Sequence, residues 1–484
     1  MPSHRYFRFK TLDDIRREAG ELHLDMIFDD EVQAVFQPVR IGDRTAGNAF
    51  VIQPMEGCDG TLDGRPGELT FRRWHRFASG GAKLIWGEAT AVVPEGRANP
   101  RQLYLAENTL SAFEKLLSSS RKVHRERYGT DGDFLIGLQL THSGRWSYRK
   151  PILAAHHPYV DAVTCIDKKR GLFVREDYQL IGDDELERLE DAYVVAAKHA
   201  ESIGFDFIDI KQCHTYLLNE LLGARNRGGK YGGSFENRTR FIRNVLDKIH
   251  DRAGNTLIVA SRINAYDGIP FSANAQNGVG EAMAHTIPYE CGFGIDPSNP
   301  GVEDVTEPIQ LVRLMKDRGV RLLNVSLGSP YYNPHIGRPY ERPSEGSYVS
   351  PEHPLIGVDR HFRITGAIQK AFPDLVVVGT GYSWLQKYFV HAAESNLKRK
   401  RVSMIGVGRG ALAYPDFAND LMVNGALNQK KVCLTVSFCT DLMRAKNNSE
   451  GQYPAGCVPR DELYAEEYKE MMKKDSVEKN KDEF

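Results

Sequence analysis

The sequence predicts an α/β protein built as a closed (β/α)8 (TIM) barrel with long βα loops and a short C-terminal extension. Short apolar runs recur along the chain with amphipathic helical patterns between them, as in sheets whose parallel strands are buried on both faces. Eight such runs lie at residues 49–53, 84–89, 134–142, 207–210, 256–262, 322–327, 376–379 and 402–406. Eight runs favour a closed barrel, and an open doubly wound sheet is the alternative.

The helical pattern before the run at 207–210 shows how the units repeat. Asp184 and Glu187 have the D-x-x-E spacing of a capping box, and apolar residues then recur at helical spacing as far as Ala200. Gly204 is expected to end this helix just before the next strand. Strand, helix and glycine stop together indicate βα units.

Three long polar loops, 143–181, 264–302 and 328–358, all follow strand ends. Such loops are uncommon unless they line a site, and they fall at the catalytic end of a barrel; surface insertions without a function are the alternative. We expect an N-terminal extension at 1–33, the barrel at 34–430, and a Cys-containing segment at 431–484. The last residues, from about 460, are rich in Glu and Lys and indicate an exposed helix that frays into a solvated tail.

The composition is that of a soluble cytoplasmic protein acting on a small molecule. Hydrophobic residues make up 41% of the 484 and charged residues 26%. A net charge of −1 offers no basic excess for nucleic acid, and no apolar run is long enough for a membrane span. The N-terminus lacks the apolar stretch of a secretory signal. The seven cysteines are mostly scattered, which indicates reduced thiols.

Polar side chains end several of the apolar runs, namely Glu88, Gln139 and Arg262. A buried polar group without a partner costs about 1–3 kcal/mol, so a ligand with several hydrogen-bonding edges would satisfy all three. Separate internal partners are the alternative. Glycine-rich turns at 377–382 and 405–410 follow the last two runs, where barrels commonly bind a phosphate, and Arg409 adds a planar cation. Tight turns without a ligand are the alternative there.

The run at 207–210 leads into Lys211, His214 and Tyr216, three side chains able to bind or move protons, and then into Tyr-Gly-Gly-Ser-Phe-Glu-Asn-Arg at 231–238. This segment resembles the Old Yellow Enzyme family of FMN-dependent oxidoreductases. From about 34 to 425 the chain is similar to the larger bacterial branch, which includes 2,4-dienoyl-CoA reductase and trimethylamine dehydrogenase.

The resemblance implies an FMN site. Gln139 would bond the pyrimidine edge, Arg262 would lie near N1 and O2, and Arg409 would join a phosphate cradle. The residues implied to bind FMN are Pro54, Met55, Glu56, Ala89, Gln139, Arg262, Gly381, Tyr382, Gly408 and Arg409.

The resemblance also implies an ene-reductase. NAD(P)H would reduce the flavin, hydride would pass to an activated C=C, and Tyr216 would donate the proton while His214 and Lys211 hold the substrate's oxygen. The alternatives are a flavin-dependent dehydrogenase of an amine or aromatising ring, and a catalytically silent flavin-binding protein. The natural substrate, NADH against NADPH, and a homo-oligomer or redox partner protein stay open.

Two residues depart from the family pattern. Lys211 replaces a histidine, and it either binds a substrate oxyanion or pairs with a carboxylate such as Glu56 or Glu88. Glu56 stands where the family has Thr or Cys beside flavin O4, and as a carboxylate there it would lower the flavin potential unless protonated or turned away.

The cysteines near the C-terminus depart as well. Larger family members hold a [4Fe–4S] cluster through C-x-x-C-x-x-C and a later cysteine. Cys433 and Cys439 match the first and third positions and Cys457 the fourth, whereas Val436 occupies the second. Three thiolates instead of four argue against a cluster, and these cysteines are its weak candidates.

Overall fold

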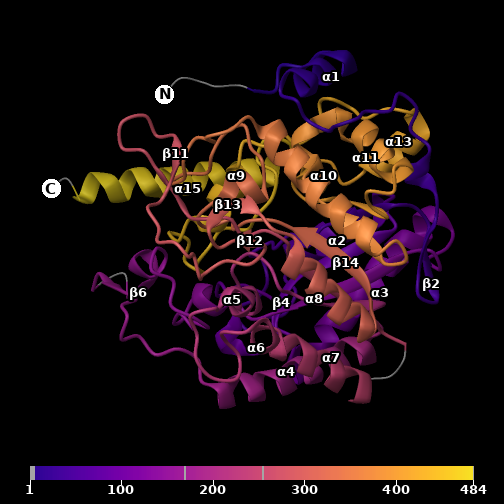
Figure 1. Cartoon of the computed structure of the whole chain (residues 1–484). Coiled ribbons are helices and arrows are strands. Elements are labelled where there is room, and N and C mark those ends of the chain that lie inside the picture. The colour runs from indigo at the N-terminus through magenta and orange to yellow at the C-terminus, as the bar shows by residue number, and fades with distance from the viewer. Residues whose placement is uncertain (1–5, 168–169, 253–255, 483–484) are drawn as a thin grey trace.

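The computed structural model describes residues 6–167, 170–252 and 256–482, with side chains up to residue 474. Eight parallel strands close into a barrel in which each strand pairs with the next along the chain and the last pairs with the first (Figure 1). They are β3 (Phe50–Ile52), β4 (Leu84–Ala91), β5 (Leu135–Thr141), β8 (Phe207–Ile210), β9 (Ile258–Asn264), β14 (Val320–Ser326), β15 (Val376–Gly379) and β16 (Met404–Val407). The predicted barrel and its eight strands are confirmed.

A helix follows each barrel strand and covers its outer face. In chain order these helices are α2 (Glu68–Ser79), α3 (Leu110–Tyr128), α4 (Asp183–Ile203), α7 (Arg240–Arg252), α8 (Thr306–Asp317), α10 (Pro354–Ala371), α11 (Phe389–Lys398) and α13 (Phe417–Asn424). Gly204 ends α4 with a φ of 96°, as predicted. The predicted capping box is wrong: α4 begins at Asp183 with Gly182 as its N-cap, so Asp184 lies inside the first turn, where its charge still favours the helix dipole.

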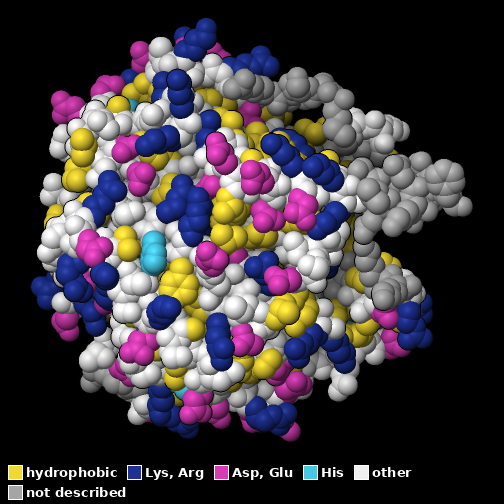
Figure 2. Space-filling model, turned by 180° about the vertical axis from the view of Figure 1, so that it is seen from behind, with side chains coloured by type: hydrophobic (Ala, Val, Ile, Leu, Met, Phe, Trp, Pro, Cys, Tyr) yellow, Lys and Arg dark blue, Asp and Glu magenta, His cyan; other side chains and the backbone are white. Residues whose placement is uncertain are grey.

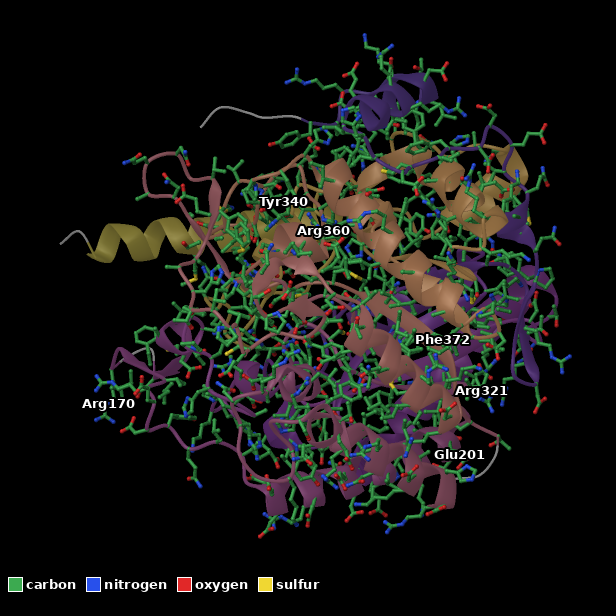
Figure 3. The ribbon with its side chains drawn as sticks, viewed as in Figure 1. Arg170, Glu201, Arg321, Tyr340, Arg360 and Phe372 are labelled. Atoms are coloured by element: carbon green, nitrogen blue, oxygen red, sulfur yellow. The ribbon has the colours of Figure 1, made fainter. Side chains whose placement is uncertain are left out.

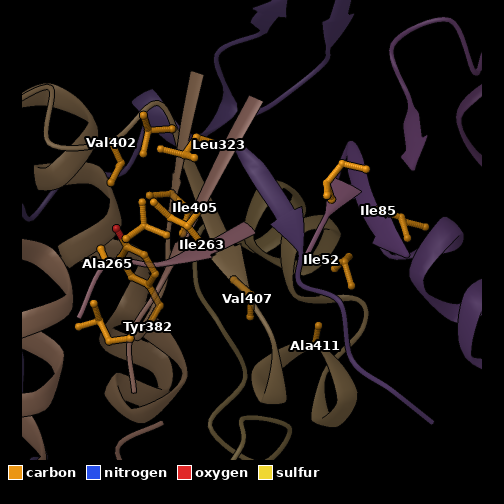
Figure 4. Close-up of a cluster of buried hydrophobic side chains, with 14 of the residues drawn as sticks. Ile52, Ile85, Ile263, Ala265, Leu323, Tyr382, Val402, Ile405, Val407 and Ala411 are labelled. Carbon is orange, nitrogen blue, oxygen red and sulfur yellow. The ribbon is translucent and has the colours of Figure 1, made fainter. Parts of the chain in front are cut away.

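Alternate strand residues enter two cores. Val51, Leu84, Trp86 and Leu322 belong to a cluster inside the barrel, which the hairpin of β1 (Val39–Ile41) and β2 (Arg44–Ala46) joins through its own buried side chains. The other residues of the strands point outward and pack against the helices (Figure 4). They include Ile52, Ile85, Ile263, Leu323, Ile405 and Val407. Burial on both faces explains why the strands read as continuous apolar runs.

The long loops gather at one end of the barrel. In Figure 3, Arg170, Tyr340 and Arg360 lie on the side reached by the loops that follow β5 and β14, whereas Glu201, Arg321 and Phe372 lie on the opposite side, where the strands begin. Short elements fold within these loops: β6 (Cys165–Asp167), β7 (Leu172–Phe173), α5 (Leu217–Gly223), α6 (Phe235–Arg238), β10 (Phe271–Ala273), β11 (Gly280–Ala282), β12 (Ile295–Asp296), β13 (Asn299–Glu303) and α9 (Pro334–Gly337).

The ends of the chain add further helices, α1 (Leu12–Glu21), α12 (Arg409–Ala413), α14 (Phe438–Arg444) and α15 (Glu462–Asp482). Tyr464 and Met471 of α15 are buried in a small core with Leu442 and Tyr453. The predicted helix is therefore present, but the prediction that it is exposed is wrong for its first part. On the face shown in Figure 2, cationic and anionic side chains are interspersed, in keeping with the net charge of −1.

Candidate active site at the barrel mouth

The residues predicted to form the site all come from the carboxyl ends of barrel strands or the turns directly after them. Pro54, Met55 and Glu56 follow β3, Ala89 and Gln139 lie in β4 and β5, Lys211, His214 and Tyr216 follow β8, Arg262 lies in β9, Gly381 and Tyr382 follow β15, and Gly408 and Arg409 follow β16. Because these strands are parallel neighbours in one closed barrel, their ends meet at a single mouth. The side chain of Tyr382 is the exception, because it points away from the mouth. Its hydroxyl accepts a hydrogen bond from Asn396 of α11 (3.0 Å), and only its backbone remains at the turn.

Asp209, which the sequence analysis did not single out, organises the floor of the mouth. Its carboxylate accepts hydrogen bonds from Gln139 Nε2 (2.6 Å), Trp86 Nε1 (2.7 Å) and the backbone N–H of Arg262 (2.6 Å). Burial raises the pKa of Asp209 against these donors. The bond fixes the amide of Gln139 so that its carbonyl oxygen is the end left for a ligand N–H. A lone Asp inside the run at 207–210 was the signal for this role.

Arg262 is buried and lacks an acceptor. Its side chain is 9% exposed, its Nε has no hydrogen-bond partner, and no ion pair involves it among the residues the structure describes. Burial lowers its pKa. Buried guanidinium groups are normally hydrogen-bonded, so this one is suited to an electron-rich ligand edge.

Lys211 lies over Tyr216 and forms no ion pair within the described residues, although the charge of Glu56 acts on it at longer range. Its Nζ is 3.6 Å from the centroid of the Tyr216 ring, and within the described chain no carboxylate comes within ion-pair distance of it. Of the two partners considered from the sequence, Glu88 pairs with Arg73 (2.5 Å), and Glu56 accepts a hydrogen bond from Asn99. Burial lowers the pKa of Lys211. Pairing with Glu56 or Glu88 is thus not found, and the amine is left for a ligand.

The hydroxyl of Tyr216 lies in a cluster of aromatic side chains. Tyr331, from the loop after β14, donates to the hydroxyl of Tyr216 at 3.4 Å and stacks on Trp146 at 3.8 Å between centroids. Burial raises the pKa of Tyr216 well above its usual range, which keeps the phenol protonated. Trp146 and Tyr331 were not predicted, since aromatic residues in long loops give no sequence signal of where they fold.

His214 sits on a strained turn. His214 and Thr215 have φ of 64° and 57°, the left-handed region that non-glycine residues rarely adopt. The imidazole Nε2 hydrogen-bonds Ser326 Oγ at 2.9 Å, and burial lowers the His214 pKa far enough to keep the ring neutral. The turn therefore presents a neutral imidazole beside the amine of Lys211.

The glycine turns form a cradle with a free cation. Gly381 has a φ of 94°, and a Cβ on it would meet His361 at 3.1 Å; a Cβ on Gly408 would meet Met55 Sδ at 3.0 Å. Arg409 Nη2 donates to Pro339 O at 2.7 Å, while its buried Nη1 has no partner. Glycine backbone with an unsatisfied guanidinium N–H suits a phosphate. The orphaned Arg262 and Arg409 groups and the oriented Gln139 therefore fit FMN.

The C-terminal cysteines line one small cavity. Cys433, Cys439 and Cys457 surround about 20 Å³ together with Val436, which is close to the space of one water molecule. In the part of the chain that the structure describes, no group of three or more His, Cys, Asp or Glu side chains is placed to hold a metal ion. These residues do not fit a four-thiolate cluster.

None of the helices in the described residues combines the length and the apolar character that crossing a membrane requires.

Comparisons with known proteins agree with this geometry. A family model described as NADH:flavin oxidoreductase / NADH oxidase matches residues 34–285. An NADPH dehydrogenase of Geobacillus sp. (strain WCH70) is 29% identical over 302 residues, which cover 61% of this chain and 73% of the relative.

Solved structures share the fold. An Old Yellow Enzyme homologue from Zymomonas mobilis has a TM-score of 0.57 at 21% identity, covering 82% of this chain and 95% of its own. A 2-naphthoyl-CoA reductase has 0.63 at 16%, and histamine dehydrogenase from Rhizobium sp. 4-9 has 0.61 at 20%; each covers 90% of this chain. The present chain spans only 58% and 53% of those two larger proteins. It belongs to the NADH:flavin oxidoreductase / NADH oxidase family, the Old Yellow Enzyme-like FMN-dependent NAD(P)H oxidoreductases.

Proposed function

We propose that the protein is an ene-reductase, which passes hydride from a flavin reduced by NAD(P)H to an activated C=C of a small organic acceptor. The observation that carries this proposal is the group after β8, where the protonated phenol of Tyr216 lies against the amine of Lys211, which forms no ion pair within the described residues. A proton donor beside a cation is what addition of hydride to an enone requires, because charge develops on the oxygen while the neighbouring carbon needs a proton.

The residues of the mouth divide these tasks. Gln139 and Arg262 hold the pyrimidine edge of the ring, and Arg409 with the two glycine turns holds the phosphate. Bound FMN supplies the hydride chemistry itself. Lys211 and the neutral His214 polarise the acceptor's oxygen, and Tyr216 delivers the proton.

Replacing Tyr216 by Phe tests the proposal. The proton transfer is lost, so we expect reoxidation of the reduced protein by 2-cyclohexenone to slow by about 10²–10⁴-fold. Reduction of the bound flavin by NADPH should keep its rate, which stopped-flow absorbance measures separately. Tyr331→Phe removes the neighbouring hydroxyl and serves as the matched control, with both rates close to those of the wild type. A Tyr216→Phe protein that reoxidises at the wild-type rate would falsify the assignment.

A flavin-dependent dehydrogenase of an amine or of an aromatising ring is the second candidate, favoured by Lys211 in place of the histidine of enone reductases. The buried cations Lys211 and Arg262 argue against an ammonium substrate, because like charges repel strongly at low dielectric. Anaerobic mixing with histamine and with NADPH decides between amine oxidation and nicotinamide-driven reduction: bleaching of the flavin by histamine and not by NADPH contradicts our proposal. A protein inert with every donor and acceptor would be the silent flavoprotein.

A further inference from the structure

Three arginines from separate segments meet beside the barrel mouth, and none of them forms an ion pair within the described residues. Arg338 follows α9, Arg409 begins α12 and Arg444 ends α14. Arg338 Nη1 donates to Thr440 Oγ1 at 2.9 Å, and Arg444 donates to Ser344 Oγ at 2.9 Å and to Pro330 O. Every acceptor they use is neutral. Within the described residues none of the three forms an ion pair with a carboxylate.

The other two arginines affect the pKa of Arg338. Burial, and then the positive charges of Arg444 and Arg409, lower the pKa of Arg338 to about 9. Its Nη2 is buried without a hydrogen-bond partner. Two buried arginines elsewhere in the chain are, by contrast, neutralised: Arg145 pairs with Glu220 at 2.5 Å, and Arg238 pairs with Glu307 at 2.6 Å. The three arginines are half-buried, and positive charges held together there without a carboxylate partner are suited to an anion.

The free arginines border the reacting groups. Arg444 binds the carbonyl of Pro330, the residue before Tyr331, and Tyr331 reaches the hydroxyl of Tyr216. The charge of Arg338 is among those that lower the pKa of His214, after burial and the charges of Arg262 and Lys211. Arg262 and Arg409 have tasks toward the flavin, whereas Arg338 and Arg444 have none there.

We propose that Arg338 and Arg444 bind a carboxylate carried by the acceptor, so that the substrate is an unsaturated organic acid. This inference rests on the proposed function and narrows its substrate class. The stacked pair of Trp146 and Tyr331 beside the arginines favours an acid with a flat, apolar body. Guanidinium groups match the planar geometry of a carboxylate, which accepts two parallel hydrogen bonds.

Equilibrium binding tests the anion site without turnover. The flavin-loaded protein is titrated with trans-cinnamate and with methyl cinnamate, and binding is followed by the visible flavin spectrum. We expect the wild type to prefer the acid, and Arg338→Gln and Arg444→Gln each to weaken the acid about 10- to 100-fold while changing ester affinity less than about twofold. Arg321→Gln removes an exposed arginine at the opposite end of the barrel and should change neither affinity.

Two further measurements keep the outcome interpretable. Arg444→Lys retains the charge and should recover part of the acid preference even where the glutamine variant folds poorly. FMN and riboflavin affinities of the apoprotein show whether either arginine serves the cofactor instead: a variant that loses FMN affinity but keeps riboflavin affinity places that arginine on the flavin phosphate and overturns the proposal. Equal binding of acid and ester by the wild type overturns it as well. Arginine-dependent acid binding without any hydride transfer would leave the anion site standing and reject the ene-reductase.

Discussion

Glu56 is the residue at the mouth whose charge state is poised near neutral pH. Burial raises its pKa to about 7, against the opposing charge of Lys211 and the hydrogen bond from Asn99. No ion pair neutralises it in the described chain. The sequence left open whether this side chain would burden a neighbouring flavin with negative charge. A protonated Glu56 below neutrality removes that burden and supplies a hydrogen-bond donor at the same place.

Stability should reveal this titration. The folded pKa of about 7 lies above the ordinary value of 4.5, so the proton is held more tightly in the folded state. The stabilisation is therefore complete below the unfolded pKa and is lost as the pH rises through about 7. Between pH 5 and 8 we expect the free energy of unfolding of the wild type to fall relative to Glu56→Gln by about 1–3 kcal/mol, measured by urea denaturation. Glu95→Gln, at an exposed position, is the control; a parallel course for both variants would contradict the assignment.

One buried arginine, Arg145, holds the loop after β5 in place. Arg145 donates to Glu220 of α5, to Asp161 and to the carbonyl of Ala155 (2.8 Å), and Glu220 also accepts the backbone N–H of Ala154 (2.8 Å). The loop is thus tied to the helix that follows the β8 turn. The next residue is Trp146, so the same tie positions the aromatic wall of the site.

Breaking the tie should free the loop and cost stability. Arg145→Met removes the arginine partner of two carboxylates, Asp161 and Glu220, and we expect a loss of about 3–5 kcal/mol in the free energy of unfolding. Proteolytic cleavage within residues 143–181 should accelerate in the folded protein, which mass spectrometry of the fragments locates. Arg149→Met removes an exposed arginine of the same loop and should leave both quantities unchanged. Equal behaviour of the two variants would mean that other contacts hold the loop.

At the scale of the whole molecule, the barrel could be predicted from the sequence because each strand and helix leaves a local, periodic pattern of apolar residues. Strands buried on both faces appear as apolar runs, and polar residues at their ends, such as Gln139 and Arg262, converge once the barrel closes. The direction in which each side chain points could not be predicted from the sequence. Tyr382 turns to α11, and Gln139 binds Asp209, because those contacts join residues far apart in sequence.

The loops hid the rest of the site for the same reason. Tyr331 and Trp146 stack across two loops of irregular structure, and Arg338 meets Arg444 only when the C-terminal segment folds back. Neither contact produces a periodic pattern in the sequence. The helical pattern of α15 showed a helix but not its buried Tyr464, because charged residues dominate that stretch.

Asp461 is a charged anchor of the C-terminal segment on helix α2. Asp461, just before α15, accepts hydrogen bonds from Arg72 (2.9 Å) and from Arg76, both on α2. These donors outweigh burial and lower its pKa, so the stability it contributes is present above the unfolded pKa and is lost as the pH falls through the folded value.

We expect Asp461→Asn to lower the free energy of unfolding by about 1–3 kcal/mol at pH 7 and to lose that difference in acid, as urea denaturation across pH will measure. Glu462→Gln, one residue on and exposed, should show neither effect. The same anchor holds the segment that carries Arg444, so Asp461→Asn should also weaken the binding of trans-cinnamate by the flavin-loaded protein more than that of its methyl ester. A destabilised variant with unchanged acid preference would separate the anchor from the arginine cluster, and would mean that α14 is held in place by its own contacts to the loop after β14, such as the bond between Arg342 and Asp441.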